Sequence, residues 1–179
     1  MSVILSRVWA MPSKWTFQVK PLLDVILRYK QDGECWIDPF AGHNSPAEIT
    51  NDLNPDSPAQ YHLEAAEFTD LLLGENMQFD GAIFDPPYSL TQVSRSYNDM
   101  GFQFKGKENP TGGFPKVRDS MSQLICPGGI VISYGWHSGG MGKTRGFEPV
   151  EYLLCAHGGN RNDTIVTVER RLGTIAANP

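Results

Sequence analysis

The stretch FDGAIFDPPYSL, residues 79–90, leads from apolar residues straight into a carboxylate, two prolines and an aromatic ring. Pro86 and Pro87 have no N–H to donate, so a β-strand cannot continue through them. Asp85 and Tyr88 therefore project from a stiff turn at the carboxyl end of a strand, where open α/β sheets bind ligands. The turn offers two fixed acceptors, the Asp85 carboxylate and the Pro86 carbonyl, beside an aromatic ring. Such a corner is suited to gripping an amino group.

Acidic residues also stand at the ends of three earlier predicted strands. IDPFAG (37–42) carries Asp38, TNDLNP (50–55) carries Asp52, and YHLEA (61–65) runs into Glu64. Taken alone, each motif also fits an ordinary β-turn or a turn cap. Their order decides between the two interpretations, because the carboxyl ends of successive parallel strands meet at one edge of a sheet. The sequence therefore predicts a cleft for a nucleoside-type cofactor at that edge.

Hydrophobic spacing and turn residues predict the elements that hold these side chains. Pro21 and the apolar residues after it indicate a helix over 20–31, and FPKVRDSMSQLIC indicates a second helix over 114–126 that stops at CPGG. Strands are predicted at 35–40, 47–55, 61–65, 79–85 and 128–136, with a closing antiparallel pair at 150–158 and 163–171. Several strands are apolar throughout, which favours a mostly parallel sheet covered on both faces.

Composition sets the class of protein. The 179 residues, 40% hydrophobic and 20% charged, suit one globular domain over 1–179. No apolar run is long enough to span a membrane, and the N-terminus is too polar for a secretory signal. The three cysteines have no metal-ligand spacing and are expected to be buried thiols in the cytoplasm. No metal site is predicted.

The net charge of −5 argues against holding nucleic acid by bulk charge. Two loops still offer local basic patches, FQFKGKE with Lys105 and Lys107, and GKTRGF with Lys143 and Arg145. Each fits an ordinary solvated loop equally well. The long segment 89–113 follows DPPY directly, so we expect it to lie beside whatever that turn binds.

DPFAG followed by DPPYS resembles the S-adenosylmethionine-dependent DNA amino-methyltransferases. The chain is similar almost end to end to small phage and mobile-element adenine-specific DNA methylases. The matching stretches are MPSKWTFQVKP (11–21), DPF (38–40), ITNDLNP (49–55), YHLEAAEF (61–68), DPPYS (85–89), GGIVISYGWHSGGMGKTRGFE (128–148) and HGGNRNDTIVTVER (157–170). The resemblance implies a Rossmann-like α/β methyltransferase fold with helices on both faces of the sheet.

The resemblance also implies how S-adenosylmethionine is held. Asp52 would accept hydrogen bonds from the ribose hydroxyls, and Glu64 with Phe68 would meet the adenine. The methionine end would lie against Asp38 and the turn that follows it, together with an N-terminal motif and Asp85. The remaining residues implied at that end are Thr16, Phe17, Pro39, Phe40 and Gly42.

One departure affects this end of the cleft. The family's F-x-G-x-G turn reads Phe40-Ala41-Gly42-His43-Asn44, so the second glycine is missing. The two carboxylates Asp38 and Asp52 are also closer in sequence than a nucleotide-binding fingerprint requires. We therefore expect HNSPAE (43–48) to be a loop in place of a helix.

For catalysis, the resemblance assigns the reaction to Asp85, Pro86, Pro87 and Tyr88. The acceptors would orient an adenine amine toward the methyl donor, and the Tyr88 ring would stack on a base flipped out of DNA. The loops beside the cleft and the end of the strand at 128–136 supply candidate DNA contacts: Ser89, Arg95, Lys105, Lys107, Trp136, Lys143 and Arg145. Trp136 fits a core or rim position equally well. We expect a single methyltransferase domain over 1–179 without a separate target-recognition domain. This predicts short sequence specificity, or a second subunit or partner that supplies it.

Two other interpretations of the cleft stay open. The same chemistry would serve an RNA adenine, a cytosine amine or a protein amide. Alternatively, the chain is a non-catalytic module that binds the cofactor or a partner. The intact DPPY turn weighs against a non-catalytic module, because simple binding does not require both amine acceptors.

Overall fold

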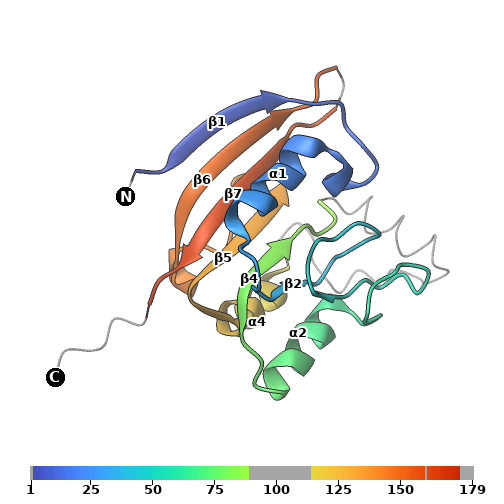
Figure 1. Cartoon of the computed structure of the whole chain (residues 1–179), viewed down its shortest axis with the longest axis vertical. Helices are drawn as coiled ribbons and strands as arrows, with labels where there is room; N and C mark the ends of the chain where they lie inside the picture. Colours follow the sequence, from blue (N-terminus) through green and yellow to red (C-terminus); the bar gives the residue numbers. More distant parts are fainter. Residues whose placement is uncertain (1, 89–113, 160, 174–179) are drawn as a thin grey trace.

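The computed structural model describes residues 2–88, 114–159 and 161–173. Their centre is a seven-stranded sheet in the order β1-β6-β7-β5-β4-β2-β3 (Figure 1). The strands are β1 (Ile4–Trp9), β2 (Trp36–Asp38), β3 (Ile49–Thr50), β4 (Phe79–Phe84), β5 (Ile125–Gly135), β6 (Phe147–Ala156) and β7 (Thr164–Arg171).

Strands β3, β2, β4 and β5 are mutually parallel, and β7 runs antiparallel to both β5 and β6. The sheet is therefore mostly parallel with one reversed strand near the C-terminus. The predicted fold class, a Rossmann-like α/β fold with a closing antiparallel strand pair, is confirmed. The parallel strands place the residues after β2, β3 and β4 at one edge of the sheet.

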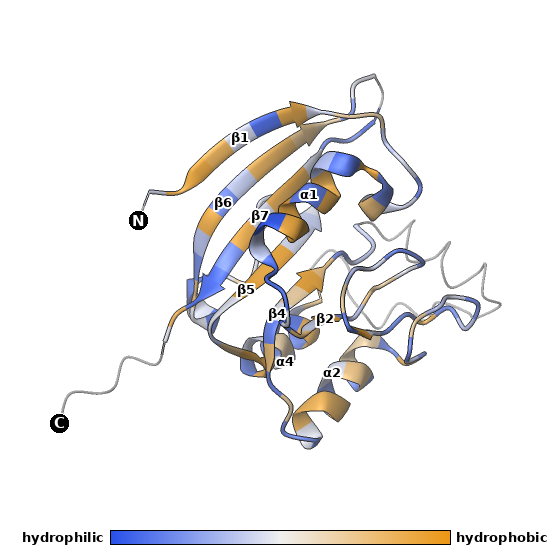
Figure 2. Ribbon diagram, viewed as in Figure 1, coloured by the Kyte–Doolittle hydropathy of each residue, from blue (hydrophilic) through white to orange (hydrophobic). Residues whose placement is uncertain are grey.

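Helices cover both faces of the sheet. The first face holds α1 (Lys20–Tyr29), whose buried Leu22, Val25 and Ile26 pack in one cluster with residues of β4, β5, β6 and β7. The second face holds α2 (Ala65–Gly74) and α4 (Pro115–Leu124), which form a second cluster against β4 and β5. In Figure 2 the apolar stripes of the helices alternate with hydrophilic residues along each ribbon. No helix in the described ranges is long and apolar enough to cross a lipid bilayer.

The strand predicted at 61–65 was wrong, and the helix that follows it was not predicted. The expected strand at 61–65 is reduced to a single bridge between Tyr61 and Asn51. The side chain of Asn51 bonds both the N–H and the C=O of Leu63, which takes those groups out of a strand ladder. Helix α2 then begins at Ala65. Its buried residues, Ala65, Phe68, Thr69 and Leu72, are spaced three or four apart, and this helical signal was missed.

The outer elements also differ from the prediction. Strand β1 was not predicted, because ILSRVW is exposed along nearly its whole length and shows no alternating burial. Helix α4 ends at Leu124, but CPGG belongs to β5, which begins at Ile125. A register shift between Phe79 and Gly81 of β4 accommodates this early start.

Gly81 is required by the packing of Trp36, which leads to a stability prediction. A Cβ atom at position 81 would lie 2.3 Å from the Cε2 atom of Trp36, and Trp36 is fully buried. We expect Gly81→Ala to lower the free energy of unfolding by about 3 kcal/mol, because overpacking a filled core forces strain. Urea unfolding followed by circular dichroism measures this change.

The matched control is Gly74→Ala at the end of α2. A Cβ atom there would have no neighbour within 4 Å. Alanine also costs less conformational entropy than glycine, so this variant is expected to be neutral or stabilised by up to about 1 kcal/mol. Equal losses at the two positions would contradict the packing account.

Candidate active site

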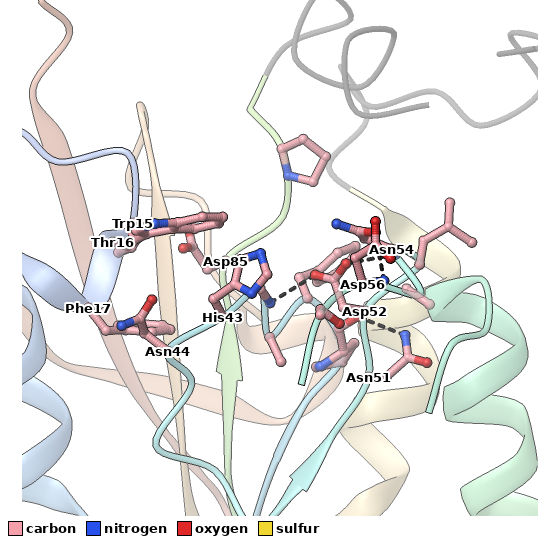
Figure 3. Close-up of a pocket in the computed structure, with 18 of the residues that line it drawn as sticks. Trp15, Thr16, Phe17, His43, Asn44, Asn51, Asp52, Asn54, Asp56 and Asp85 are labelled. Carbon is pink, nitrogen blue, oxygen red and sulfur yellow. Dashed lines mark hydrogen bonds between the residues drawn. The ribbon is translucent and has the colours of Figure 1, made fainter. Parts of the chain in front are cut away.

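A cavity of about 560 Å³ opens at the carboxyl edge of the sheet. Its lining comes from the segment before α1, the loops after β2 and β3, the start of α2 and the end of β4. Figure 3 shows Trp15, Thr16 and Phe17 on one side of this cavity and Asn51, Asp52, Asn54 and Asp56 on the other. The structure thus brings together most residues that the sequence singled out for a cofactor: Thr16, Phe17, Pro39, Phe40, Gly42, Asp52, Glu64 and Asp85. Of the other residues predicted for catalysis, Pro87 also lines the cavity.

Asp85 lies in the cavity wall directly after β4, partly exposed to the cavity. The hydroxyl of Tyr88 donates to its Oδ1 atom, and the Thr16 side chain is a second hydrogen-bond partner. Burial raises the pKa of this carboxyl above its ordinary value, while the two hydroxyls act in the opposite direction. A carboxylate in such a place is a strong acceptor that has few competing waters.

The two prolines shape the corner around Asp85. Strand β4 ends at Phe84, and Pro86 is buried while Pro87 lines the cavity. Because neither ring can donate to a neighbouring strand, the turn is set by its own fixed φ angles. Tyr88 does not line the cavity. Its ring lies 5.6 Å from the ring of Trp136, centre to centre, at a tilt of 58°.

Asp52 joins two of the loops that form the cavity. Its Oδ2 atom accepts the N–H of Gly42 at 2.8 Å, and its Oδ1 atom accepts the N–H of Asn54 at 2.9 Å. Gly42 has a φ of +55°, a conformation that favours glycine. Each carboxylate oxygen keeps a second lone pair, so Asp52 can still accept from a ligand in the cavity.

Asn51 is a site residue that the sequence analysis missed. It is buried, and its side-chain amide donates to the carbonyls of Pro39 and Leu63 at 3.1 and 3.0 Å. Its Oδ1 atom accepts the N–H of Leu63 at 2.9 Å. One side chain thereby fixes the loops after β2 and β3 and the approach to α2. A polar residue immediately before Asp52, at a strand end, was the available signal.

Asp38 does not line the cavity, in contrast to the role that the resemblance implied. It is fully buried beneath the turn, where it accepts the Phe40 N–H at 2.9 Å and the Ser45 hydroxyl at 2.6 Å. Loss of water raises the pKa of this carboxyl to about 7, against the effect of those two hydrogen bonds. Nearby Asp85 and Asp52 act in the same direction as burial. Asp38 therefore holds the turn that carries Phe40 and Gly42.

This buried carboxyl gives a pH prediction. The folded chain keeps the Asp38 proton up to about pH 7, whereas the unfolded chain releases it near pH 3.8. The stability contributed by Asp38 is therefore complete below the unfolded pKa and is lost as the pH rises through the folded pKa. Between pH 5 and pH 8 the wild type should lose about 3 kcal/mol relative to Asp38→Asn, whose amide is always neutral.

Urea unfolding of both proteins at several pH values measures this difference directly. The other acidic groups are common to both chains, so the difference between them reports Asp38. A difference that does not change with pH would contradict a protonated carboxyl at this position.

Glu64 and Phe68, both predicted to contact the cofactor adenine, differ in their access to the cavity. Glu64 precedes the first residue of α2 and lines the cavity, whereas Phe68 is fully buried in the core and does not reach it. Phe40 lines the cavity and packs edge to face against Phe84 and Phe114, with ring planes at 81° and 63°. The aromatic support of this part of the cavity therefore comes from Phe40 and its neighbours.

Trp15 and His43 form a wall that the sequence analysis did not assign. Their rings meet edge to face with centres 4.5 Å apart, and the Lys14 ammonium lies 4.7 Å from the centre of the Trp15 ring. All three residues line the cavity. The segment SKWTF is far from the strand ends in sequence, so only the fold brings it to them.

The residues implied as DNA contacts are only partly described. Trp136 follows β5 and is 40% exposed, beside Tyr88. Lys143 is exposed on the short turn η3 (Lys143–Arg145), while Arg145 pairs with Asp119 at 2.7 Å. Neither residue of η3 lines the cavity. Ser89, Arg95, Lys105 and Lys107 lie outside the described residues. Among the residues that are described, no group of three His, Cys, Asp or Glu side chains is placed to hold a metal ion.

Comparison by sequence identifies no relative. No protein-family model matches the chain, and no curated protein matches it.

Comparison by structure gives many matches to solved proteins. A structure of SMU.776 complexed with SAH matches with a TM-score of 0.55 at 10% identity, over 83% of this chain and 48% of that one. TrmN from Thermus thermophilus matches with a TM-score of 0.52 at 18% identity, over 86% and 49%.

A third match is a 1,6-didemethyltoxoflavin-N1-methyltransferase from Burkholderia thailandensis, solved with bound 1,6-didemethyltoxoflavin and S-adenosylhomocysteine. It has a TM-score of 0.53 at 13% identity, and covers 86% of this chain and 78% of that one. The chain spans about half the length of SMU.776 and of TrmN. At these identities the likeness establishes the fold.

Proposed function

We propose that the chain is an S-adenosylmethionine-dependent methyltransferase that methylates the exocyclic amine of adenine in DNA. The observation that carries the proposal is the position of Asp85-Pro86-Pro87-Tyr88. Asp85 and Pro87 of this turn line a large cavity whose lining also includes Asp52 and Glu64. Proteins of the same fold have been solved with S-adenosylhomocysteine, the product form of this cofactor.

The donor set of the cavity fits the cofactor. Asp52 has free lone pairs for the two ribose hydroxyls, and Glu64 offers an acceptor for the adenine amine beside Leu63 and Ala65. Asp85 and the turn at Gly42 lie toward the segment of Trp15 and Thr16, where a cationic ammonium would be accepted. A volume of about 560 Å³ is in the usual range of small-molecule sites.

The cofactor, when bound, supplies an electrophilic methyl group on a sulfonium. The residues of the chain bind the exocyclic amine of the target adenine and orient it toward that methyl group. An adenine amine is a poor nucleophile, since its lone pair is delocalised into the ring. Asp85 accepts one N–H and the Pro86 carbonyl accepts the other, which turns the lone pair outward and stabilises the positive charge that develops on nitrogen. Because the Pro-Pro turn is rigid, both acceptors are in place before the substrate arrives.

Tyr88 and Trp136 provide the aromatic surface for a base that has left the helix. Extruding a base from a duplex costs a few kcal/mol, and stacking on an aromatic ring offsets about 1–3 kcal/mol of it. The Tyr88 hydroxyl is bonded to Asp85. When the amine binds, the Tyr88 hydroxyl must give up its bond to Asp85 so that the carboxylate can accept the amine. The nearby Thr16 hydroxyl offers Tyr88 an alternative hydrogen-bond partner.

Nucleoside mass spectrometry of cells that express the chain tests the proposal. We expect N6-methyladenine in their DNA, and none above background in cells that express Asp85→Ala. The same cells separate the alternatives. Methylated RNA adenine would appear among the RNA nucleosides, methylated cytosine would appear as a different nucleoside, and a methylated protein amide would require mass spectrometry of the protein fraction. Cofactor binding without any methylated product would identify a non-catalytic module.

A further inference from the structure

Strand β1 forms an open edge of the sheet. It lies outermost in the strand order and pairs with β6 alone, in parallel register from Ile4 opposite Glu151 to Trp9 opposite Ala156 (Figure 1). Among the described residues, its outer side has no strand partner. Half of its backbone donors and acceptors therefore point away from the molecule. A regular edge of this kind is a template for pairing with another strand.

The side chains of β1 do not protect this edge. Ile4, Leu5 and Trp9 are 53%, 77% and 63% exposed, and Figure 2 shows β1 as largely hydrophobic. The strand contains no proline or glycine, and Arg7 is its single charged residue. Soluble proteins usually block edges with prolines, bulges or several charges. An apolar edge without these devices indicates a surface that is covered in the working protein.

One face of β1 is also uncovered. The side chain of Ser6 reaches Glu151, which binds Arg28 and Tyr29 of α1, so Ser6 faces the α1 side. Alternation along a strand then places Leu5 and Trp9 on the opposite face. On that face the described helices α2 and α4 pack against β4 and β5, away from β1.

We propose that a second copy of this chain covers the edge, with the two β1 strands paired antiparallel about a twofold axis at Ser6. A twofold axis perpendicular to the sheet keeps each residue on its own face, so odd positions meet odd positions and even positions meet even ones. Centred on Ser6, the pairing sets Ile4 opposite Val8 of the second copy and Leu5 opposite Arg7 of the second copy. The result is one continuous sheet through both subunits.

The sequence of β1 fits itself in this register. Two β-branched apolar residues, Ile4 and Val8, meet across the pair, and the small Ser6 meets its own copy at the centre. The aliphatic stem of Arg7 lies over Leu5 while its guanidinium reaches water. Centring the axis on Arg7 would set like charges directly opposite each other, which is destabilising. A single cation on the edge gives no reason to select a strongly charged partner.

The experiment uses the purified full chain and a cysteine at the axis. In Ser6→Cys the two thiols would face each other across the pair, within the reach of a disulfide. Under mild oxidation this variant should form a covalent dimer, whereas Ser138→Cys, at an exposed position away from β1, should not. Analytical ultracentrifugation of the wild type should show dimers that dissociate on dilution.

Charge variants at Leu5 test the register. Leu5→Arg would face Arg7 of the second copy twice in each dimer, whereas Leu5→Glu would form two opposite-charge pairs. The dissociation constant should therefore be about tenfold higher for Leu5→Arg than for Leu5→Glu. Leu27→Arg is the matched control, because Leu27 is 60% exposed on α1 and outside the proposed interface.

Three results would overturn the proposal. The first is a wild type that stays monomeric at high micromolar concentration and a Ser6→Cys chain that stays uncrosslinked. The second is equal weakening by Leu5→Arg and Leu27→Arg, which would place the contact elsewhere. The third is equal effects of Leu5→Arg and Leu5→Glu, which would exclude this register. None of these readouts depends on methylation, so they stand apart from the proposed activity.

Discussion

Replacing Asp85 with Asn should lower kcat for methyl transfer by about a thousandfold, the size of loss seen when one fixed group that stabilises developing charge is removed. The substitution keeps the shape of the side chain and removes its charge. One oxygen becomes an NH2 group, which faces the donors Thr16 and Tyr88 with no lone pair to offer. The amine of the substrate then loses its charged acceptor, and its nitrogen lone pair is no longer oriented toward the methyl group of the cofactor.

Steady-state kinetics with labelled cofactor and adenine-containing DNA measure this loss. Cofactor affinity should change much less than kcat, because the proposed ribose and adenine acceptors are Asp52 and Glu64. Asp32→Asn, on an exposed turn after α1, is the control for a general effect of neutralising a carboxylate. A variant Asp85→Asn with near wild-type kcat would remove Asp85 from the mechanism.

Replacing Asp52 with Asn should weaken binding of S-adenosylhomocysteine about a hundredfold. Hydrogen bonds to a charged acceptor contribute about 1.5–3 kcal/mol, and 2.7 kcal/mol corresponds to a hundredfold change in Kd. The same change disturbs the loops, because Asp52 also accepts the N–H groups of Gly42 and Asn54. An amide in its place must turn one NH2 group toward one of those donors.

Isothermal titration calorimetry with S-adenosylhomocysteine measures the affinity. Asp56→Asn is the matched control, because Asp56 lines the same cavity on the same loop. We expect it to bind the ligand nearly as well as the wild type. At saturating cofactor, Asp52→Asn should keep most of its kcat, which separates binding from chemistry. Equal losses of affinity at the two positions would show a diffuse charge effect in place of a specific acceptor.

The sequence predicted the location of the site because parallel strands impose it. Asp52 and Asp85 follow β3 and β4, and the carboxyl ends of these strands meet at one edge whatever the details of packing. The missing second glycine and the short interval after Asp38 also predicted a loop at 43–48. The structure has no helix there.

The direction in which individual side chains point could not be predicted from the local sequence. Asp38 and Asp52 both end strands in similar turns, yet Asp38 faces the interior and Asp52 faces the cavity. Phe68 belongs to the core because it lies on the buried side of α2, a helix whose start depends on the bonds from Asn51 to Leu63. Trp15 reaches the cavity through contacts between distant segments. These features depend on tertiary packing, which no local pattern encodes.

The most direct measurement is a crystal structure of the chain with S-adenosylhomocysteine and an adenine-containing oligonucleotide. We expect the adenine amine at hydrogen-bonding distance, about 2.9 Å, from both the Asp85 carboxylate and the Pro86 carbonyl. We also expect the cofactor ribose on Asp52, with the cofactor sulfur beside that amine. A complex in which the cofactor lies outside this cavity, or in which the amine points away from Asp85, would rule out the proposed role of Asp85.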